Sequence, residues 1–121
     1  MSAFARYALV GALATLGHWL LMVLLVEGAG MAPWLASGCG AAFGAQLAFF
    51  GNRRFTFNHA AAAGPAWWRF MGTAALGAVL GMAVVAAGVA LGAHYLLAQA
   101  LATGLVLLLT FVINRGWTFA R

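Results

Sequence analysis

A six-residue motif that occurs twice constrains the fold of this chain more than any other feature. The two copies lie 62 positions apart and read Asn52-Arg53-Arg54-Phe55-Thr56-Phe57 and Asn114-Arg115-Gly116-Trp117-Thr118-Phe119. Leu35-Ala36 and Leu97-Ala98 have the same spacing, and Arg6-Tyr7 and Arg69-Phe70 match one residue out of step. Such internal similarity predicts two copies of one structural unit. We place them at residues 4–57 and 67–119, with a linker at residues 58–66.

The composition indicates that lipid is the solvent of this chain. Apolar residues make up 66% of the sequence and charged residues 6%, whereas a soluble domain carries about 25% charged residues. Four continuous apolar stretches, at roughly 7–26, 31–51, 70–93 and 95–113, approach the length of about 20 residues that a helix needs to cross a bilayer. Continuous runs favour helices over the alternating pattern of a β-barrel. We therefore predict an all-α membrane protein in which residues 1–121 form one domain of four transmembrane helices.

The basic residues predict the orientation of the chain. All six are arginines, and in a four-span topology all six fall on one side of the membrane, opposite the lone acid Glu27. The positive-inside rule then places both termini and the linker in the cytoplasm, which makes this a multi-pass protein of the cytoplasmic (inner) membrane. Because each repeat has two spans, both repeats enter from the same side and are parallel rather than inverted.

The repeated motif also predicts a binding site. Its asparagine and first arginine follow an apolar span in each copy, and the two other matching arginines open the first and third spans on the same side. The planar arginine fork binds phosphate through two parallel hydrogen bonds. The predicted phosphate site at the inner face contains Arg6, Asn52, Arg53, Arg69, Asn114 and Arg115. In the alternative interpretation, the arginines serve topology and contact anionic headgroups.

Two further polar residues lie within apolar spans. Gln46 needs a hydrogen-bonding partner there, and either substrate contact or an interhelical hydrogen bond would supply one. His18 is either part of a proton relay or a neutral imidazole bonded to a carbonyl group. The small residues of Gly40-xxx-Gly44-xxx-Ala48 and Gly77-xxx-Gly81 predict closely packed helices.

The sequence lacks the patterns of an enzyme. It contains no paired carboxylates, no Cys–His metal spacing and no nucleophile beside a base. We therefore expect no catalytic residues, no metal and no cofactor. The high isoelectric point reflects arginines on a membrane protein, so nucleic acid is not an expected partner.

The chain resembles the GtrA-like family of small four-helix membrane proteins over essentially its whole length. Besides the two copies of the motif, the resemblance rests on Arg6-Tyr7-x-x-Val10-Gly11, Pro33-Trp34-Leu35-Ala36, Arg69-Phe70 and Tyr95-Leu96-Leu97-Ala98. It implies translocation (flipping) of polyprenyl-phosphate-linked sugars across the cytoplasmic membrane for cell-surface polysaccharide synthesis or glycosylation. It also implies a membrane glycosyltransferase as a partner.

Two alternatives stay open beside this reading. The chain could be a non-transporting anchor or scaffold for a glycosyltransferase, with the arginine motifs as docking surfaces. A small multidrug-type exporter is disfavoured, because such proteins rely on an acidic residue within the membrane and Glu27 lies at the boundary. Four spans form a thin pathway, so we expect a homo-oligomer, most simply a dimer.

Overall fold

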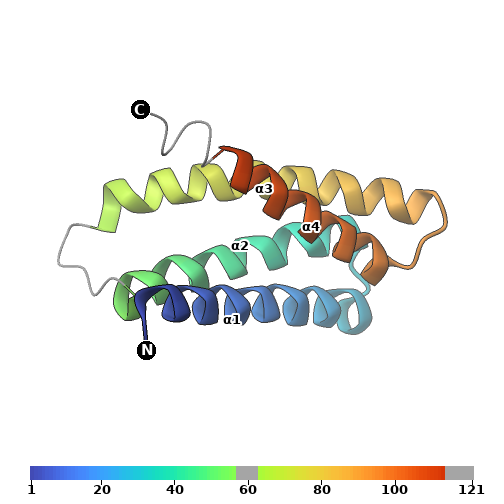
Figure 1. The fold of residues 1–121 in the computed structure, drawn as a ribbon. Helices are drawn as coiled ribbons and strands as arrows, with labels where there is room; N and C mark the ends of the chain where they lie inside the picture. The colour runs from blue at the N-terminus through green and yellow to red at the C-terminus, as the bar shows by residue number, and fades with distance from the viewer. Residues whose placement is uncertain (57–62, 114–121) are drawn as a thin grey trace.

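The computed structural model describes residues 1–56 and 63–113, and within these ranges it contains helices and no strands. The elements are α1 (Ala3–Val23), the π-helical segment η1 (Leu24–Gly28), α2 (Pro33–Gly51), the π-helical segment η2 (Asn52–Thr56), α3 (Ala63–Ala90) and α4 (Tyr95–Ile113). Figure 1 shows α1, α2 and α3 running in roughly one direction, with α4 inclined to them. The prediction of an all-α membrane fold is confirmed.

Local sequence signals account for the helix ends. At the start of α1, the backbone N–H of Ala5 donates to Ser2 Oγ over 3.1 Å, which is the N-cap bond expected of serine. Pro33 opens α2, where its missing N–H would have no helical partner. Gly30 and Gly92, which are 62 positions apart, adopt φ values of +68° and +95° in the turns before α2 and α4. Glycine enters this left-handed region without steric cost.

The third helix begins earlier than the sequence indicates. The pair Gly64-Pro65 is typical of a linker, yet α3 starts at Ala63, inside the linker predicted at 58–66. Proline is tolerated in the first turn of a helix, because the N–H group that it lacks has no acceptor there. The predicted linker therefore overlaps the first turn of α3.

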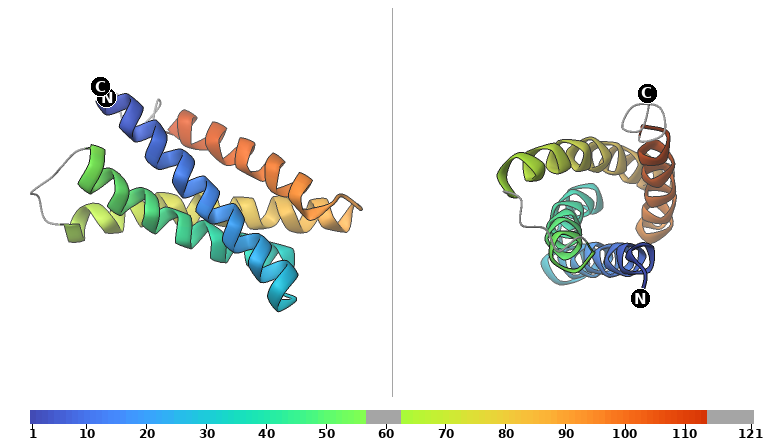
Figure 2. Two further views of the ribbon diagram at one scale, coloured as in Figure 1. Left: turned by 90° about the horizontal axis from the view of Figure 1, so that it is seen from below. Right: turned by 60° about the vertical axis from the view of Figure 1, so that its left-hand side comes forward.

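The four helices form an open ring. α1 packs along α2, α2 along α3, and α3 along α4. In the described residues α1 and α4 have no comparable packing, and the right-hand view of Figure 2 places them at the two sides of the opening. The N-terminal ends of α1 and α3 and the C-terminal end of α2 lie together at one end of the ring (Figure 1). This arginine end carries Arg6, Arg53, Arg54 and Arg69. The other end, the Glu27 end, contains η1 and the start of α4.

Three of these helical stretches, Phe4–Gly28, Trp67–Ala90 and Tyr95–Val112, are long and apolar enough to cross a membrane. α2 forms where a second span is predicted but is not among them. Its glycines, its serine and Gln46 lower its hydropathy. Because α2 packs against both α1 and α3, these small and polar residues face other helices, where close approach matters more than apolar area. A fourth span at α2 stays a prediction.

The buried residues lie mainly at the Glu27 end. The core there consists of Met22, Ala36, Val85, Ala98 and Ala102, one or two from each helix. Many large apolar side chains elsewhere are exposed outside the cavity lining, including Leu20, Phe50, Val79 and Leu108. Their outward positions on all four helices fit a bundle whose outer surface contacts lipid.

Glycines allow two helix pairs to approach closely. A Cβ atom at Gly40 of α2 would lie 2.5 Å from the carbonyl oxygen of His18, and one at Gly44 would lie 3.0 Å from that of Ala14. In the other pair, a Cβ atom at Gly77 of α3 would lie 3.0 Å from Val106 of α4. The predicted close packing at these glycines is confirmed.

Candidate functional site: a polar cavity between the helices

A cavity of about 1330 Å³ lies between the four helices, and all four contribute to its lining. Along α3 the lining runs from Trp68 to Gly81. At a rise of 1.5 Å per residue this is about 20 Å, roughly two-thirds of the apolar thickness of a bilayer. The cavity therefore extends from the arginine end past the middle of the bundle. Beyond it, at the Glu27 end, lies the buried apolar core.

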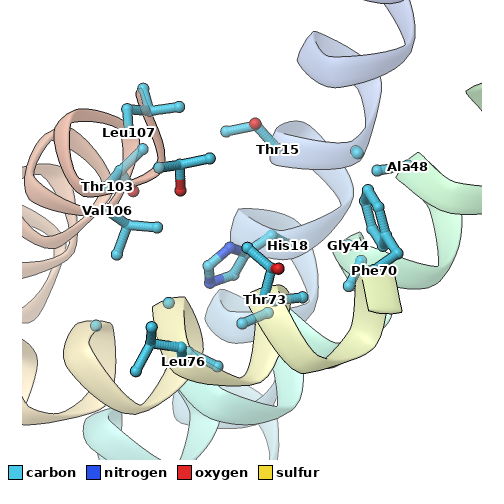
Figure 3. Close-up of a pocket in the computed structure, with 18 of the residues that line it drawn as sticks. Thr15, His18, Gly44, Ala48, Phe70, Thr73, Leu76, Thr103, Val106 and Leu107 are labelled. Carbon is cyan, nitrogen blue, oxygen red and sulfur yellow. The ribbon is translucent and has the colours of Figure 1, made fainter. Parts of the chain in front are cut away.

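The cavity wall carries polar groups at mid-helix positions. Figure 3 shows Thr15 and His18 of α1, Thr73 of α3 and Thr103 of α4 around one space. Thr15 donates its hydroxyl hydrogen to Gly11 O over 2.9 Å, so the hydroxyl group is satisfied within its own helix. Its oxygen lone pairs stay available to a guest molecule. His18 Nε2 is buried and has no hydrogen-bonding partner in the described residues.

A chain of hydrogen bonds joins three helices at the deep end of the cavity, away from the arginine end. Ser37 Oγ of α2 donates to Gln99 Oε1 of α4 over 2.6 Å. Gln99 Nε2 donates to Thr103 Oγ1 over 3.1 Å, and Trp19 Nε1 of α1 donates to the same oxygen over 3.3 Å. Ser37 and Gln99 are both buried and both line the cavity. This network separates the cavity from the apolar core.

Breaking the Ser37–Gln99 bond should cost a measurable share of stability. Replacing Ser37 by alanine leaves Gln99 Oε1 buried without its donor, which costs about 1–3 kcal/mol. Replacing both residues, Ser37→Ala with Gln99→Leu, should cost less than the sum of the single changes. Unfolding in mixed micelles of increasing SDS fraction measures the four free energies of this cycle. Strict additivity would contradict the bond.

The arginine end supplies the charged part of the site. Arg69 is exposed at the start of α3 and lines the cavity. Arg6 is half-buried, and its Nε is buried without a hydrogen-bonding partner in the described residues. It lies one turn before Val10, whose side chain would be 2.8 Å from a Cβ atom at Gly51, directly before Asn52. An unsatisfied guanidinium nitrogen at such a position suits an anionic ligand.

The other predicted site residues are distributed differently. Asn52 and Arg53 lie in η2, which packs against α1, and each takes part in an interaction within the protein. Neither lines the cavity. Asn114 and Arg115 lie outside the described residues. The structure thus places Arg69 in the cavity wall and Arg6 at the α1–α2 contact near η2.

Gln46 lies outside the cavity wall. Trp67 Nε1 of α3 donates to Gln46 Oε1 over 3.0 Å, and Gln46 Nε2 lies 3.0 Å from Met71 Sδ. The side chain therefore joins α2 to α3 and matches the interhelical alternative. Substrate contact by Gln46 is not supported by this placement.

The sequence prediction missed most of the polar cavity wall. No role is predicted from the sequence for Ser37, Thr73, Gln99 or Thr103. One signal was available: Ser37 and Gln99 are 62 positions apart, the spacing of the repeated motif. Among the described residues, no three His, Cys or Glu side chains come together as a metal site would require.

Comparison with known proteins agrees with this architecture. The family profile described as GtrA/DPMS, transmembrane domain, matches residues 6–119, nearly the whole chain. The protein belongs to the GtrA/DPMS family. No curated protein and no solved structure matches it. Family membership and the apolar helices identify a multi-pass membrane protein, and they associate it with polysaccharide or glycosylation processes at a membrane.

Proposed function

We propose that this GtrA/DPMS-family protein translocates polyprenyl-phosphate-linked sugars across the cytoplasmic membrane. The observation that carries the proposal is a large cavity with polar groups inside an otherwise apolar helix bundle, with Arg69 in its wall. A phosphate and a sugar cross a bilayer slowly, because each unpaired charge or polar group costs several kcal/mol in the apolar core. A cavity that offers a guanidinium group and hydroxyl groups lowers that cost.

In this proposal, one set of residues binds the phosphate of the head group and another set contacts the sugar. Arg69 and Arg6 bind the phosphate at the arginine end, where Asn52 and Arg53 also lie, and we propose the same role for their repeat equivalents Asn114 and Arg115. Thr73, Thr103 and His18 face the sugar deeper in the cavity, where hydroxyl and imidazole groups can exchange hydrogen bonds with it. Several weak partners suit transport, because tight binding at one place would hold the substrate.

The proposed architecture is two parallel repeats of two helices. Two of the three buried positions described in α1 recur in α3 at a spacing of 63: the residue pairs are Ala14 with Gly77 and Met22 with Val85. Three of the five buried positions of α2 recur in α4 at a spacing of 62: the residue pairs are Ala36 and Ala98, Ser37 and Gln99, and Gly40 and Ala102. Ser37 and Gln99 are hydrogen-bonded to each other. Contact between equivalent residues is expected where a two-fold axis passes between two repeats.

The arrangement supports an inward-facing state with cytoplasmic termini. The positive-inside rule assigns the arginine end to the cytoplasm, and the cavity begins at this end. At the Glu27 end, the apolar core and a hydrogen bond of 2.8 Å from the Tyr95 hydroxyl to Glu27 Oε2 hold η1 against α4. A substrate would therefore load from the cytoplasmic side and leave after this end opens.

The proposed activity makes and breaks no covalent bond, so other proteins must supply the chemistry. We propose that one membrane glycosyltransferase loads the lipid on the cytoplasmic side and another uses it outside. We also propose that two copies of the chain associate, since four helices form a narrow pathway.

Reconstitution in liposomes tests translocation. A labelled polyprenyl-phosphate sugar is placed in both leaflets, and its accessibility to an external reagent is followed over time. Wild-type protein should raise the rate of exposure at least tenfold above protein-free vesicles, because the cavity replaces lost hydration. The Arg53→Ala/Arg115→Ala double mutant, reconstituted at equal density, should fall well below the wild type.

One result would replace the transport proposal. If the wild type does not accelerate exposure, yet purifies stably with a glycosyltransferase, the protein is an anchor for that enzyme. The arginine end would then be a docking surface, and the cavity would have no part in lipid movement.

A further inference from the structure

The α1–α4 seam, meaning the facing surfaces of the first and last helices, is open. The other neighbouring helices pack along each other, whereas α1 and α4 have no comparable packing in the described residues. The hydrogen bond from Trp19 to Thr103 joins them near mid-helix. Towards the arginine end Tyr7 of α1 and Phe111 of α4 are 53% and 60% exposed. The cavity wall includes Tyr7 and Val112 on either side of this gap.

The α2–α3 seam shows a closed version of the same contact. The rings of Phe49 and Phe70 lie 5.6 Å apart, and Phe49 is only 7% exposed. The repeat equivalent of Phe49 is Phe111, 62 positions later in the chain. The equivalent of Phe70 is Tyr7, 63 positions earlier. The α1–α4 seam thus has aromatic residues at the two positions whose equivalents are in contact in the α2–α3 seam.

A second contact between α2 and α3 has equivalent residues in α1 and α4 at the same two spacings. In the closed seam, a Cβ atom at Gly38 would lie 2.6 Å from Met82 Sδ. The same shifts carry Gly38 onto Ala100 and Met82 onto Trp19. Trp19 bonds to Thr103, one turn beyond Ala100 on the same face of α4. The two seams therefore match at mid-helix and differ towards the arginine end.

We propose that the α1–α4 seam is a lateral gate that admits the isoprenoid chain of a lipid phosphate. The open gate lets the polar head enter the cavity while the chain stays in the bilayer. The closed gate brings Tyr7 against Phe111 as Phe70 lies against Phe49. This inference rests on the proposed function and the proposed repeat, and it adds the route by which the substrate enters.

The chemistry on the two sides of the gap favours this occupant. Inside, Arg69 and the threonine hydroxyl groups suit a phosphate-linked head. Outside, Phe4 and Leu108, which are 79% and 59% exposed, offer an apolar rim to lipid. A molecule that is polar at one end and a single long hydrocarbon at the other satisfies both sides at once. Two-chain phospholipids would need a wider slot.

Oxidative cross-linking tests closure of the gate. The Tyr7→Cys/Phe111→Cys pair is introduced into the Cys39→Ala protein in nanodiscs, with Phe49→Cys/Phe70→Cys as the matched control at the closed seam. The test pair should form a disulfide within one chain, and saturating short-chain polyprenyl phosphate should slow its formation at least fivefold. The control pair should react at the same rate with and without the lipid.

Four results would overturn the gate. Disulfides between two chains would identify the seam as a dimer interface. No disulfide, where the control pair reacts, would show that the seam does not close. Binding of polyprenyl phosphate by native mass spectrometry without protection of the test pair would place the chain elsewhere. Absence of binding would refute the proposed function together with the gate, whereas protection without translocation in liposomes would leave the gate and refute transport.

Discussion

Replacing Arg69 by lysine should weaken binding of polyprenyl phosphate about tenfold or more. Lysine keeps the positive charge, and hence the orientation of the protein, but it loses the planar fork that binds two phosphate oxygens. A hydrogen bond to a charged group contributes about 1.5–3 kcal/mol, which corresponds to roughly 10–150-fold in affinity. Arg69 is the described arginine that lines the cavity. The dissociation constant in nanodiscs measures the effect.

Arg54→Lys is the matched control for this change. Arg54 lies at the same end of the bundle, is exposed and does not line the cavity. It should therefore bind the lipid as the wild type does. An equal loss of affinity in both variants would mean that binding is sensitive to any arginine at this end of the bundle. Wild-type affinity in both would mean that the arginines only determine the orientation of the protein in the membrane.

Replacing Gly40 by leucine should prevent the protein from folding to its native bundle. A Cβ atom at this position would lie 2.5 Å from the carbonyl oxygen of His18. Backbone cannot move aside as a flexible side chain can, so α1 and α2 must separate along their length. Overpacking usually costs 1–3 kcal/mol and occasionally more, and a clash with backbone belongs to the upper part of this range. The yield of monodisperse protein in detergent and its unfolding midpoint measure the loss.

Gly104→Leu provides the comparison within the same bundle. Gly104 lies on α4, is exposed, and has nothing within 4 Å of an added Cβ atom. Leucine there extends into lipid and is a better helix former than glycine, which costs about 0.8–1.0 kcal/mol relative to alanine in a helix interior. We expect unchanged or higher stability. Comparable destabilisation by both substitutions would contradict the close α1–α2 contact.

The positions of the helices follow from local sequence. Apolar runs predicted spans at roughly 31–51 and 95–113, and the helices cover Pro33–Gly51 and Tyr95–Ile113. These limits are set by adjoining turns, where Gly30 and Gly92 adopt positive φ. The start of α3 was missed because Gly64-Pro65 fits both a linker and a first helical turn. The π-helical form of η2 had no signal in the sequence.

The cavity could not be predicted in the same way. A threonine in an apolar helix can satisfy its hydroxyl group on its own backbone, as Thr15 does with Gly11 O, so it indicates no preferred direction. These helices are also largely apolar all round, and no polar face shows which side is inward. The charged part of the site was easier to predict, because Arg6 and Arg69 match each other between the repeats, one residue out of step with the motif. Their difference in burial depends on tertiary packing.

The open seam is beyond sequence reasoning for a related reason. Both seams carry aromatic pairs, Phe49 with Phe70 and Phe111 with Tyr7, so the sequence treats them alike. The structure closes the first and leaves the second open. The difference between the two seams depends on the conformational state of the bundle, which the sequence does not specify.

The small side chains of the apolar core have a consequence for the energetics of opening at the Glu27 end. Three of its five buried residues, Ala36, Ala98 and Ala102, are alanines. Such small side chains bury little apolar area each, so exposing them in a water-accessible exit forfeits less hydrophobic free energy than exposing a core of leucines would. The polar contacts Ser37–Gln99 and Tyr95–Glu27 then form the principal enthalpic barrier. If the protein translocates lipid as proposed, the rate at which the Glu27 end opens should therefore depend more on these two hydrogen bonds than on buried area.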